Sequence, residues 1–182
     1  MGLSLVTPTT ADAITLAEAR DACKVTHPLQ DVEIANLIFA AREWSQWFSG
    51  RVFMAQTWDY FLHYFPSVIE LPLAPVQSIT SVKYFDYAGI EQTLSGAAYE
   101  SDLRSVVQRI RPAAGYSWPG TADRYNAVTV RFVAGYASDH PDLLTIRQAM
   151  LLHIRAHFDP EDSERNMKQA EALLWPLKIP GF

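Results

Sequence analysis

The sequence lacks the features of a secreted, membrane-bound or disordered protein. Its single cysteine among 182 residues, Cys23, rules out an internal disulfide. It has no run of the roughly 18 apolar residues that a membrane helix needs, and no charged start followed by an apolar segment. Only 19% of the residues are charged and 49% are hydrophobic, a balance that excludes disorder. We therefore expect a soluble globular protein of a reducing compartment, without membrane contact.

Motifs for nucleotide binding and covalent catalysis are also missing. There is no glycine-rich dinucleotide loop, no P-loop and no complete nucleophile-elbow motif. The sequence therefore predicts a protein that is not an enzyme and holds no cofactor. One catalytic alternative stays open, because His153 and His157 have the spacing that lets two imidazoles bind one metal ion. Ile154 stands where a metalloprotease has its glutamate, so buried packing is the favoured interpretation of the pair.

Two of the five tryptophans offer a third class of function. Trp58 and Trp118 could act as stacking platforms for a sugar or a base in a small ligand-binding module. Both lie next to apolar segments, as does Trp47, and Trp44 lies on an apolar helical stripe, so packing inside the protein is favoured for all four tryptophans. No binding motif accompanies them, so this alternative depends on residue type alone.

Hydrophobic periodicity predicts helices near both ends of the chain. Within 14–50, Thr15 and Glu18 have capping-box spacing, and Gly50 stands where a glycine commonly ends a helix. A second helical region covers 141–175, with apolar residues at steps of three and four. The sequence thus predicts two N-terminal and two C-terminal helices.

Residues 52–136 have the composition of strands and turns, rich in β-branched and aromatic residues and punctuated by proline and glycine. The clearest strand is 127–133, where buried and exposed side chains should alternate. Other expected strands are 57–64, 68–71, 106–110 and a hairpin over 81–94. The order of elements predicts an α+β fold, in which a small antiparallel β module is inserted into a helical bundle within one domain, 1–182.

The net charge of −5 is unevenly distributed. Residues 103–136 carry five arginines and one aspartate, a local charge of +4, so the remainder carries −9. The overall acidity argues against a protein that grips nucleic acid, because such a grip needs Lys and Arg at the phosphates. Four of the arginines could dock an acidic partner or could simply be solvated: Arg104, Arg109, Arg111 and Arg124.

The end of the chain, 176–182, is apolar and broken by two prolines. Chain termini are usually polar and frayed, so apolar residues there need a surface to cover. This segment either packs on its own helices or orders on a partner. The residues concerned are Trp175, Leu177, Ile179 and Phe182.

Several short segments follow one another in an order that resembles the head-to-tail connector (adaptor) proteins of tailed double-stranded DNA phages and gene transfer particles. The resemblance covers most of the chain from Leu16 to His157. The segments are Ala41–Trp44, Ser49–Arg51, Gln56–Trp58, Ile69–Pro72, Pro75–Val82, Arg109–Pro112, Trp118–Pro119, Asn126–Val130, Ala134–Tyr136 and Ile146–Leu152.

The resemblance implies a virion structural protein at the head-to-tail junction, assembled in the host cytoplasm. Family members form a ring, typically a dodecamer, beneath the portal protein. The ring lengthens the channel for packaged DNA, which passes without sequence-specific binding, and offers a platform to a stopper or tail protein. An isolated chain could be a monomer. A head-closure (stopper) or tail-completion protein is the rival role.

The resemblance also gives the candidate surfaces their partners. Trp175, Leu177, Ile179 and Phe182 would grip the portal. Arg104, Arg109, Arg111 and Arg124 would face the next subunit or the stopper.

Overall fold

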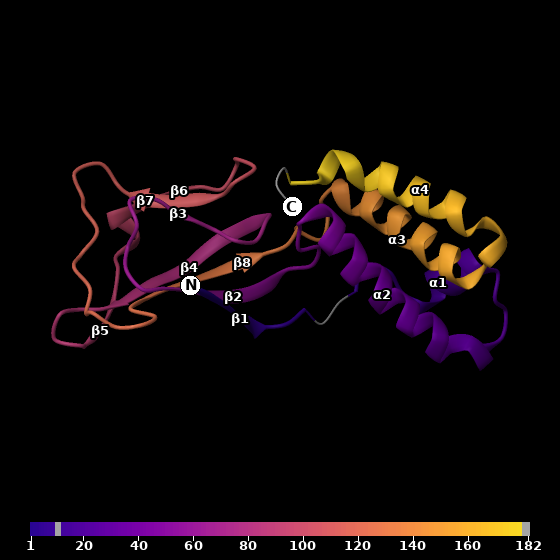
Figure 1. Ribbon diagram of the computed structural model, residues 1–182, viewed down its shortest axis with the longest axis horizontal. Helices are drawn as coiled ribbons and strands as arrows, with labels where there is room; N and C mark the ends of the chain where they lie inside the picture. Colours follow the sequence, from indigo (N-terminus) through magenta and orange to yellow (C-terminus); the bar gives the residue numbers. More distant parts are fainter. Residues whose placement is uncertain (10–11, 180–182) are drawn as a thin grey trace. The chain divides into compact units, whose positions relative to one another are not determined.

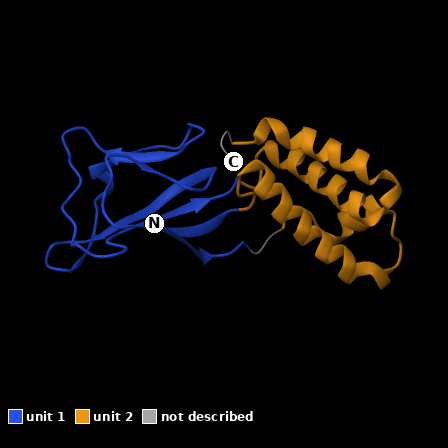
Figure 2. Ribbon diagram, viewed as in Figure 1, with its two compact units in different colours: residues 1–9, 55–136 blue, residues 10–54, 137–182 orange. Residues whose placement is uncertain are grey.

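The computed structural model describes residues 1–9 and 12–179 and confirms the predicted α+β fold class. Two helices precede, and two follow, the antiparallel strands of residues 56–134. The chain forms two compact units (Figure 2). The β unit comprises Met1–Thr9 and Ala55–Tyr136, and the helical unit comprises Thr10–Met54 and Ala137–Phe182. In the described ranges, no helix is long and apolar enough to span a membrane.

The helical unit is built around α3, which contacts each of the other three helices. In Figure 1, α2 and α4 flank α3. The helices are α1 (Leu16–Cys23), α2 (Asp31–Ser49), α3 (Asp142–Phe158) and α4 (Ser163–Leu174). Short 3-10 turns cover Pro28–Gln30, Pro160–Asp162 and Trp175–Leu177.

Local signals in the sequence place the helix ends. The Thr15 hydroxyl accepts the Glu18 N–H at 3.2 Å, and the Glu18 carboxylate accepts the Thr15 N–H at 2.8 Å. This capping box stabilises the start of α1 by about 1 kcal/mol. At the end of α2, Gly50 has a φ of 70°, a left-handed conformation that glycine adopts without strain.

The core of the helical unit is apolar on the faces that meet α3. Cys23 is only half-buried, and Ala19 is the buried residue of α1. Partial burial raises the pKa of the Cys23 thiol. The other buried positions include Ile34, Ile38 and Ala41 of α2, Ile146, Met150 and Ile154 of α3, and Ala170 and Leu174 of α4.

The β unit contains two antiparallel sheets. The five-stranded sheet has the order β1 (Gly2–Thr7), β2 (Gln56–Leu62), β8 (Val128–Ala134), β4 (Val76–Phe85) and β5 (Glu91–Thr93). The three-stranded sheet has the order β3 (Ile69–Glu70), β7 (Arg109–Pro112) and β6 (Tyr99–Asp102). The edge strand β1 was not predicted. The strand expected at 106–110 is displaced, because β7 begins only at Arg109 and Val106 and Val107 are exposed before it.

Strand β8 has the alternating burial that its sequence predicts. Val130 and Phe132 are fully buried, and Phe132 lies opposite Trp58 of β2 and Ile79 of β4. The opposite face carries Arg131, whose guanidinium donates two hydrogen bonds of 2.7 Å to the Asp59 carboxylate. That pairing raises the pKa of Arg131. One face of the sheet is therefore the core, and the other holds an ion pair.

Candidate interaction surfaces

Two of the predicted arginines, Arg109 and Arg111, lie two residues apart on β7 and point to the same face. Both are exposed. Across the strand register, Arg109 faces Asp102 and Arg111 faces Glu100 of β6. The closest nitrogen–oxygen distances are 3.5 Å for Arg109–Asp102 and 2.5 Å for Arg111–Glu100. These four side chains, with Val68 and Ser101, line an open groove of about 410 Å³.

The strand register places acidic side chains beside the arginines of residues 103–136. Glu100 and Asp102 lie just before the range 103–136 in the sequence but directly beside its arginines in space. The Ser105 hydroxyl and backbone N–H lower the pKa of Asp102, which keeps its carboxylate ionised at neutral pH. The groove therefore carries two neighbouring ion pairs, and not the basic patch that the local charge of +4 suggests.

The other two arginines are separate from this groove. Arg124 is exposed, and its guanidinium lies over the Phe85 ring, 4.0 Å from the centroid. Arg104 is exposed in the turn after β6. Within residues 1–9 and 12–179, neither side chain forms a salt bridge. The four predicted arginines thus do not form one cluster, although all four are accessible.

The C-terminal segment packs on its own helical unit as far as Ile179, which is only 7% exposed. The Ile179 N–H donates to the Ser49 carbonyl at 3.0 Å, and the Arg51 guanidinium donates to the Leu177 carbonyl at 2.5 Å. As far as residue 179, the segment therefore lies on its own helical unit, which is the first of the two outcomes that the sequence left open. Ile179 is buried, so its side chain is not accessible to a partner in this conformation.

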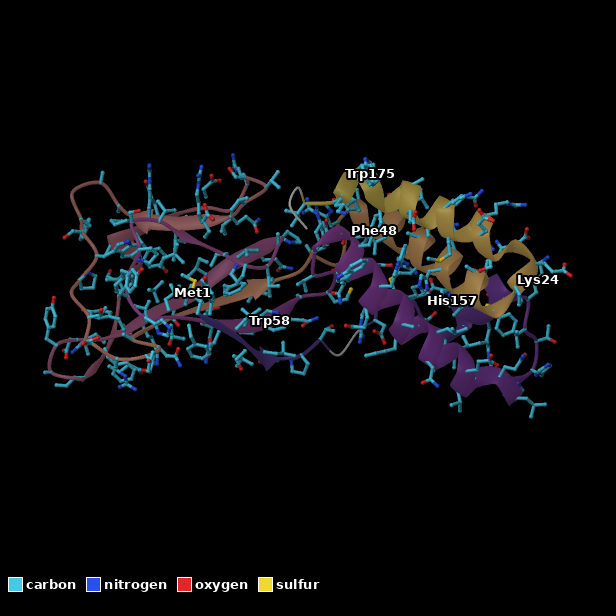
Figure 3. All side chains as sticks on the ribbon, viewed as in Figure 1. Met1, Lys24, Phe48, Trp58, His157 and Trp175 are labelled. Atoms are coloured by element: carbon cyan, nitrogen blue, oxygen red, sulfur yellow. The ribbon has the colours of Figure 1, made fainter. Side chains whose placement is uncertain are left out.

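Trp175 differs from Leu177 and Ile179 because 67% of it is exposed. It follows the last residue of α4 (Figure 3). The Lys178 ammonium lies 5.9 Å from the Trp175 ring centroid and 5.3 Å from that of Phe48. Leu177 is half-buried, and the predicted partner residue Phe182 lies outside the described residues. Among the described members of the predicted set, Trp175 is therefore the exposed one.

Helix α2 exposes an apolar surface that the sequence analysis missed. Val32 and Trp47 are each 77% exposed and Phe39 is 58% exposed. Trp47 was expected to pack inside the protein, yet only Trp44 does so: it stacks on Phe48 and on His153. We call the following residues the α2 outer face: Val32, Ala35, Asn36, Phe39, Glu43 and Trp47.

The two histidines of α3 pack against each other. Their ring centroids are 4.3 Å apart, and His153 is only 4% exposed. Burial, and secondarily the nearby His157, lower the pKa of His153 to about 4. Nδ1 of His157 lies 3.0 Å from the His153 carbonyl oxygen. No group of three or more metal-binding side chains occurs in the described part of the chain, so the metal-dependent alternative gains no further ligand.

The two tryptophans of the ligand-binding alternative are half-buried in the β unit. Trp118 stacks on Phe65 with ring centroids 4.7 Å apart and an interplanar angle of 9°. The indole nitrogens of Trp58 and Trp118 are buried and have no hydrogen-bond partner among the described residues. A free stacking platform needs an open ring face, and Phe65 occupies one face of Trp118.

No protein-family model matches the chain, and no curated protein matches it. Solved structures do match over its whole length. A chain in the neck of an empty gene transfer agent (GTA) particle, computed with C6 symmetry, aligns with a TM-score of 0.79 and 20% identity. A chain of the native GTA virion aligns with a TM-score of 0.74 and 20% identity. A chain from the native GTA neck, computed with C12 symmetry, aligns with a TM-score of 0.72 and 19% identity. Each alignment covers 100% of this chain and 97% of the other. The chain therefore shares its fold with chains of these particles.

Proposed function

We propose that this chain is a head-to-tail adaptor of a phage-like particle, with a structural role and no catalytic one. The single observation that carries the proposal is the end-to-end match in fold with chains of GTA necks and virions. About a dozen copies form a ring beneath the portal protein and lengthen the DNA channel. The ring then offers a docking platform to a stopper or tail protein.

Symmetry and charge support this role. Two of the matching necks were computed with C6 or C12 symmetry, which fits a closed cyclic ring. At −5 per chain, a ring of about twelve copies carries about sixty negative charges. A lumen without a positive excess lets DNA slide, because it does not neutralise the phosphates.

Within this role, the C-terminal segment docks on the portal. Trp175 is the residue best placed for that contact, since it is large, apolar and exposed at the end of α4. Aromatic residues of this kind often dominate binding energy. Leu177 and Phe182 complete the predicted contact, whereas Ile179 first has to leave its own unit.

Replacing Trp175 by alanine is expected to reduce the yield of tailed particles by about tenfold or more, because a central aromatic contact is lost in every copy of the ring. Folding should be unchanged, since most of the side chain lies in solvent. The measurement is a count of tailed and tailless heads by electron microscopy, in cells that make the particle with the variant as the only copy.

Leu144→Ala is the matched control, because Leu144 is also apolar and is 71% exposed on α3 of the same unit. Its particles should have normal tails, and cells without the chain should give only tailless heads. Normal tails in the absence of the chain would overturn the adaptor proposal. If the Trp175→Ala variant gives normal tails while cells without the chain do not, the portal contact does not depend on Trp175. A chain that cross-links to the tail but never to the portal would favour the stopper role.

The arginines of the β unit are proposed to face the next subunit or the stopper. Because Arg109 and Arg111 already pair with Asp102 and Glu100, a simple charge reversal would bring four carboxylates together and disturb β6 and β7. A charge swap avoids this problem. It exchanges each arginine with its acidic partner across the strands, which keeps the internal pairs and inverts the pattern presented outward.

The swapped variant, R109D/R111E/E100R/D102R, is expected to keep its fold, with stability lowered only by loss of the hydrogen bonds that Asp102 accepts from Arg104 and Ser105. It should assemble poorly with wild-type neighbours, because specificity at such surfaces depends on charge pattern. Thermal unfolding checks the fold, and the yield of tailed particles checks the docking. Full assembly by the swapped variant would show that this ladder of ion pairs faces solvent in the particle.

A further inference from the structure

The exposed apolar residues of α2 lie on the side of the helix that points away from α3. Successive residues turn by about 100°, so Val32, Phe39 and Trp47 fall on one stripe, opposite the buried Ile34, Ile38 and Ala41. Among the described residues of the helical unit, the Arg42 guanidinium lies over the Phe39 ring, 5.0 Å from its centroid, yet Phe39 and Trp47 together still expose on the order of 250 Å². An exposed stripe of this kind marks a binding surface.

A groove beside Phe39 extends the stripe toward α1. It has a volume of about 440 Å³, and its apolar lining comes from Ile14, Leu16, Ala35, Ile38 and Phe39. The two charged residues of the groove, Asp12 and Arg42, form a salt bridge with each other. The α2 outer face and this groove thus form one mainly apolar surface, and the carboxylate of Glu43, on the stripe itself, pairs with Arg42 at 3.3 Å.

The other flank of the helical unit has the opposite character. Helix α4 buries Asn166, Ala170 and Leu174 and turns charged residues outward. We call Glu164, Arg165, Lys168 and Glu171 the α4 outer face. Lys168 pairs with Glu164 at 2.6 Å. In Figure 1, α3 lies between α2 and α4, so the two outer faces belong to opposite flanks of the unit.

We propose that the α2 outer face is the subunit interface of the ring and binds the α4 outer face of a second copy of this chain. This inference rests on the proposed adaptor function. A ring of more than two copies needs heterologous contacts, in which two different patches meet. The aliphatic stems of Arg165 and Lys168 cover Phe39 and Trp47, while their charged ends keep their own partners, Asp162 and Glu164. With 19 residues, α2 is about 28 Å long, which suits an interface of about 800 Å² per partner.

The test uses the full chain with Cys23→Ser as background and one new cysteine on each flank, N36C and E171C, which leave Arg165 and Lys168 in place. Both positions are exposed on helices. A short bifunctional thiol reagent, applied to the concentrated protein and to intact particles, should yield a ladder of covalent multimers. Each single-cysteine variant should stay a monomer on a denaturing gel. The pair N36C/Q148C is the matched control, because Gln148 is exposed on α3 and lies on neither outer face.

Trp47→Glu in the double-cysteine variant should reduce the ladder by about tenfold or more, since it places a carboxylate in the apolar contact while the monomer keeps its helix content. Dimers from N36C alone would reveal a symmetric contact and overturn the proposal. So would the absence of a ladder from both samples. If cells without the chain lack tails but particles show no ladder, the proposed subunit interface is wrong and the adaptor function stands. A ladder in solution from a chain that is absent from particles overturns the adaptor function instead.

Discussion

Acidification from about pH 7 to about pH 4 is expected to lower the free energy of unfolding by about 3 kcal/mol through His153 alone. The buried imidazole is neutral in the folded protein, where its pKa is lowered from 6.5 to about 4. The unfolded chain binds a proton at this site near pH 6.5, and the folded chain does so only near pH 4. The stabilisation is therefore complete above pH 6.5 and is lost as the pH falls toward 4.

Urea denaturation followed by far-ultraviolet circular dichroism, repeated between about pH 7 and pH 4, measures this loss. Carboxylates also titrate in this range, so the comparison is with His153→Leu, which keeps every carboxylate and removes the imidazole. The variant should lose about 3 kcal/mol less than the wild type over the interval. Equal losses in the two proteins would show that His153 accepts a proton in the folded state as readily as in the unfolded state.

The helices and the main strands could be predicted because their signals are local. The capping box at Thr15 and Glu18 and the glycine at position 50 each act within a few residues of a helix end. The hairpin turn is similar, since the Asp86 carboxylate accepts N–H groups from Ala88 and Ile90 only a few residues away. Such interactions join residues that are close together in the sequence, so a short segment is enough to predict them.

Strand β1 could not be predicted, because its formation depends on distant residues. Leu3 pairs with Tyr60 and Leu5 pairs with Trp58, more than 50 residues along the chain. All six residues of β1 are exposed, so the strand has no buried face and contributes little apolar packing of its own. An edge strand of this kind can be recognised only when the position of its partner β2 in the sheet is known.

The candidate surfaces show the same limit. The sequence identified Arg109 and Arg111 as exposed cations, but only the strand register reveals Glu100 and Asp102 beside them. Trp44 and Trp47 both looked like core residues, because each belongs to an apolar segment. They point about 60° apart on the helix, and α3 covers only the first. Which apolar residue faces outward depends on where the neighbouring helix lies.

Replacing Phe132 by alanine is expected to lower the free energy of unfolding by about 4 kcal/mol, because a fully buried aromatic side chain leaves a cavity between three strands. Trp58 and Ile79, its neighbours on β2 and β4, belong to a sheet that cannot close around the lost volume without breaking its register. Urea denaturation followed by tryptophan fluorescence measures the change, since Trp58 lies directly opposite the substituted residue.

Val133→Ala is the matched control, because Val133 is the next residue on β8 and points to the opposite, half-buried face. This substitution should lower the free energy of unfolding by less than about 1 kcal/mol, since less apolar area returns to water and no enclosed cavity forms. If both substitutions cost the same, the face that carries Arg131 must bury as much apolar surface as the face that carries Phe132. In that case the core of the β unit would extend to both sides of the five-stranded sheet, and the Arg131–Asp59 pair would be an interior ion pair.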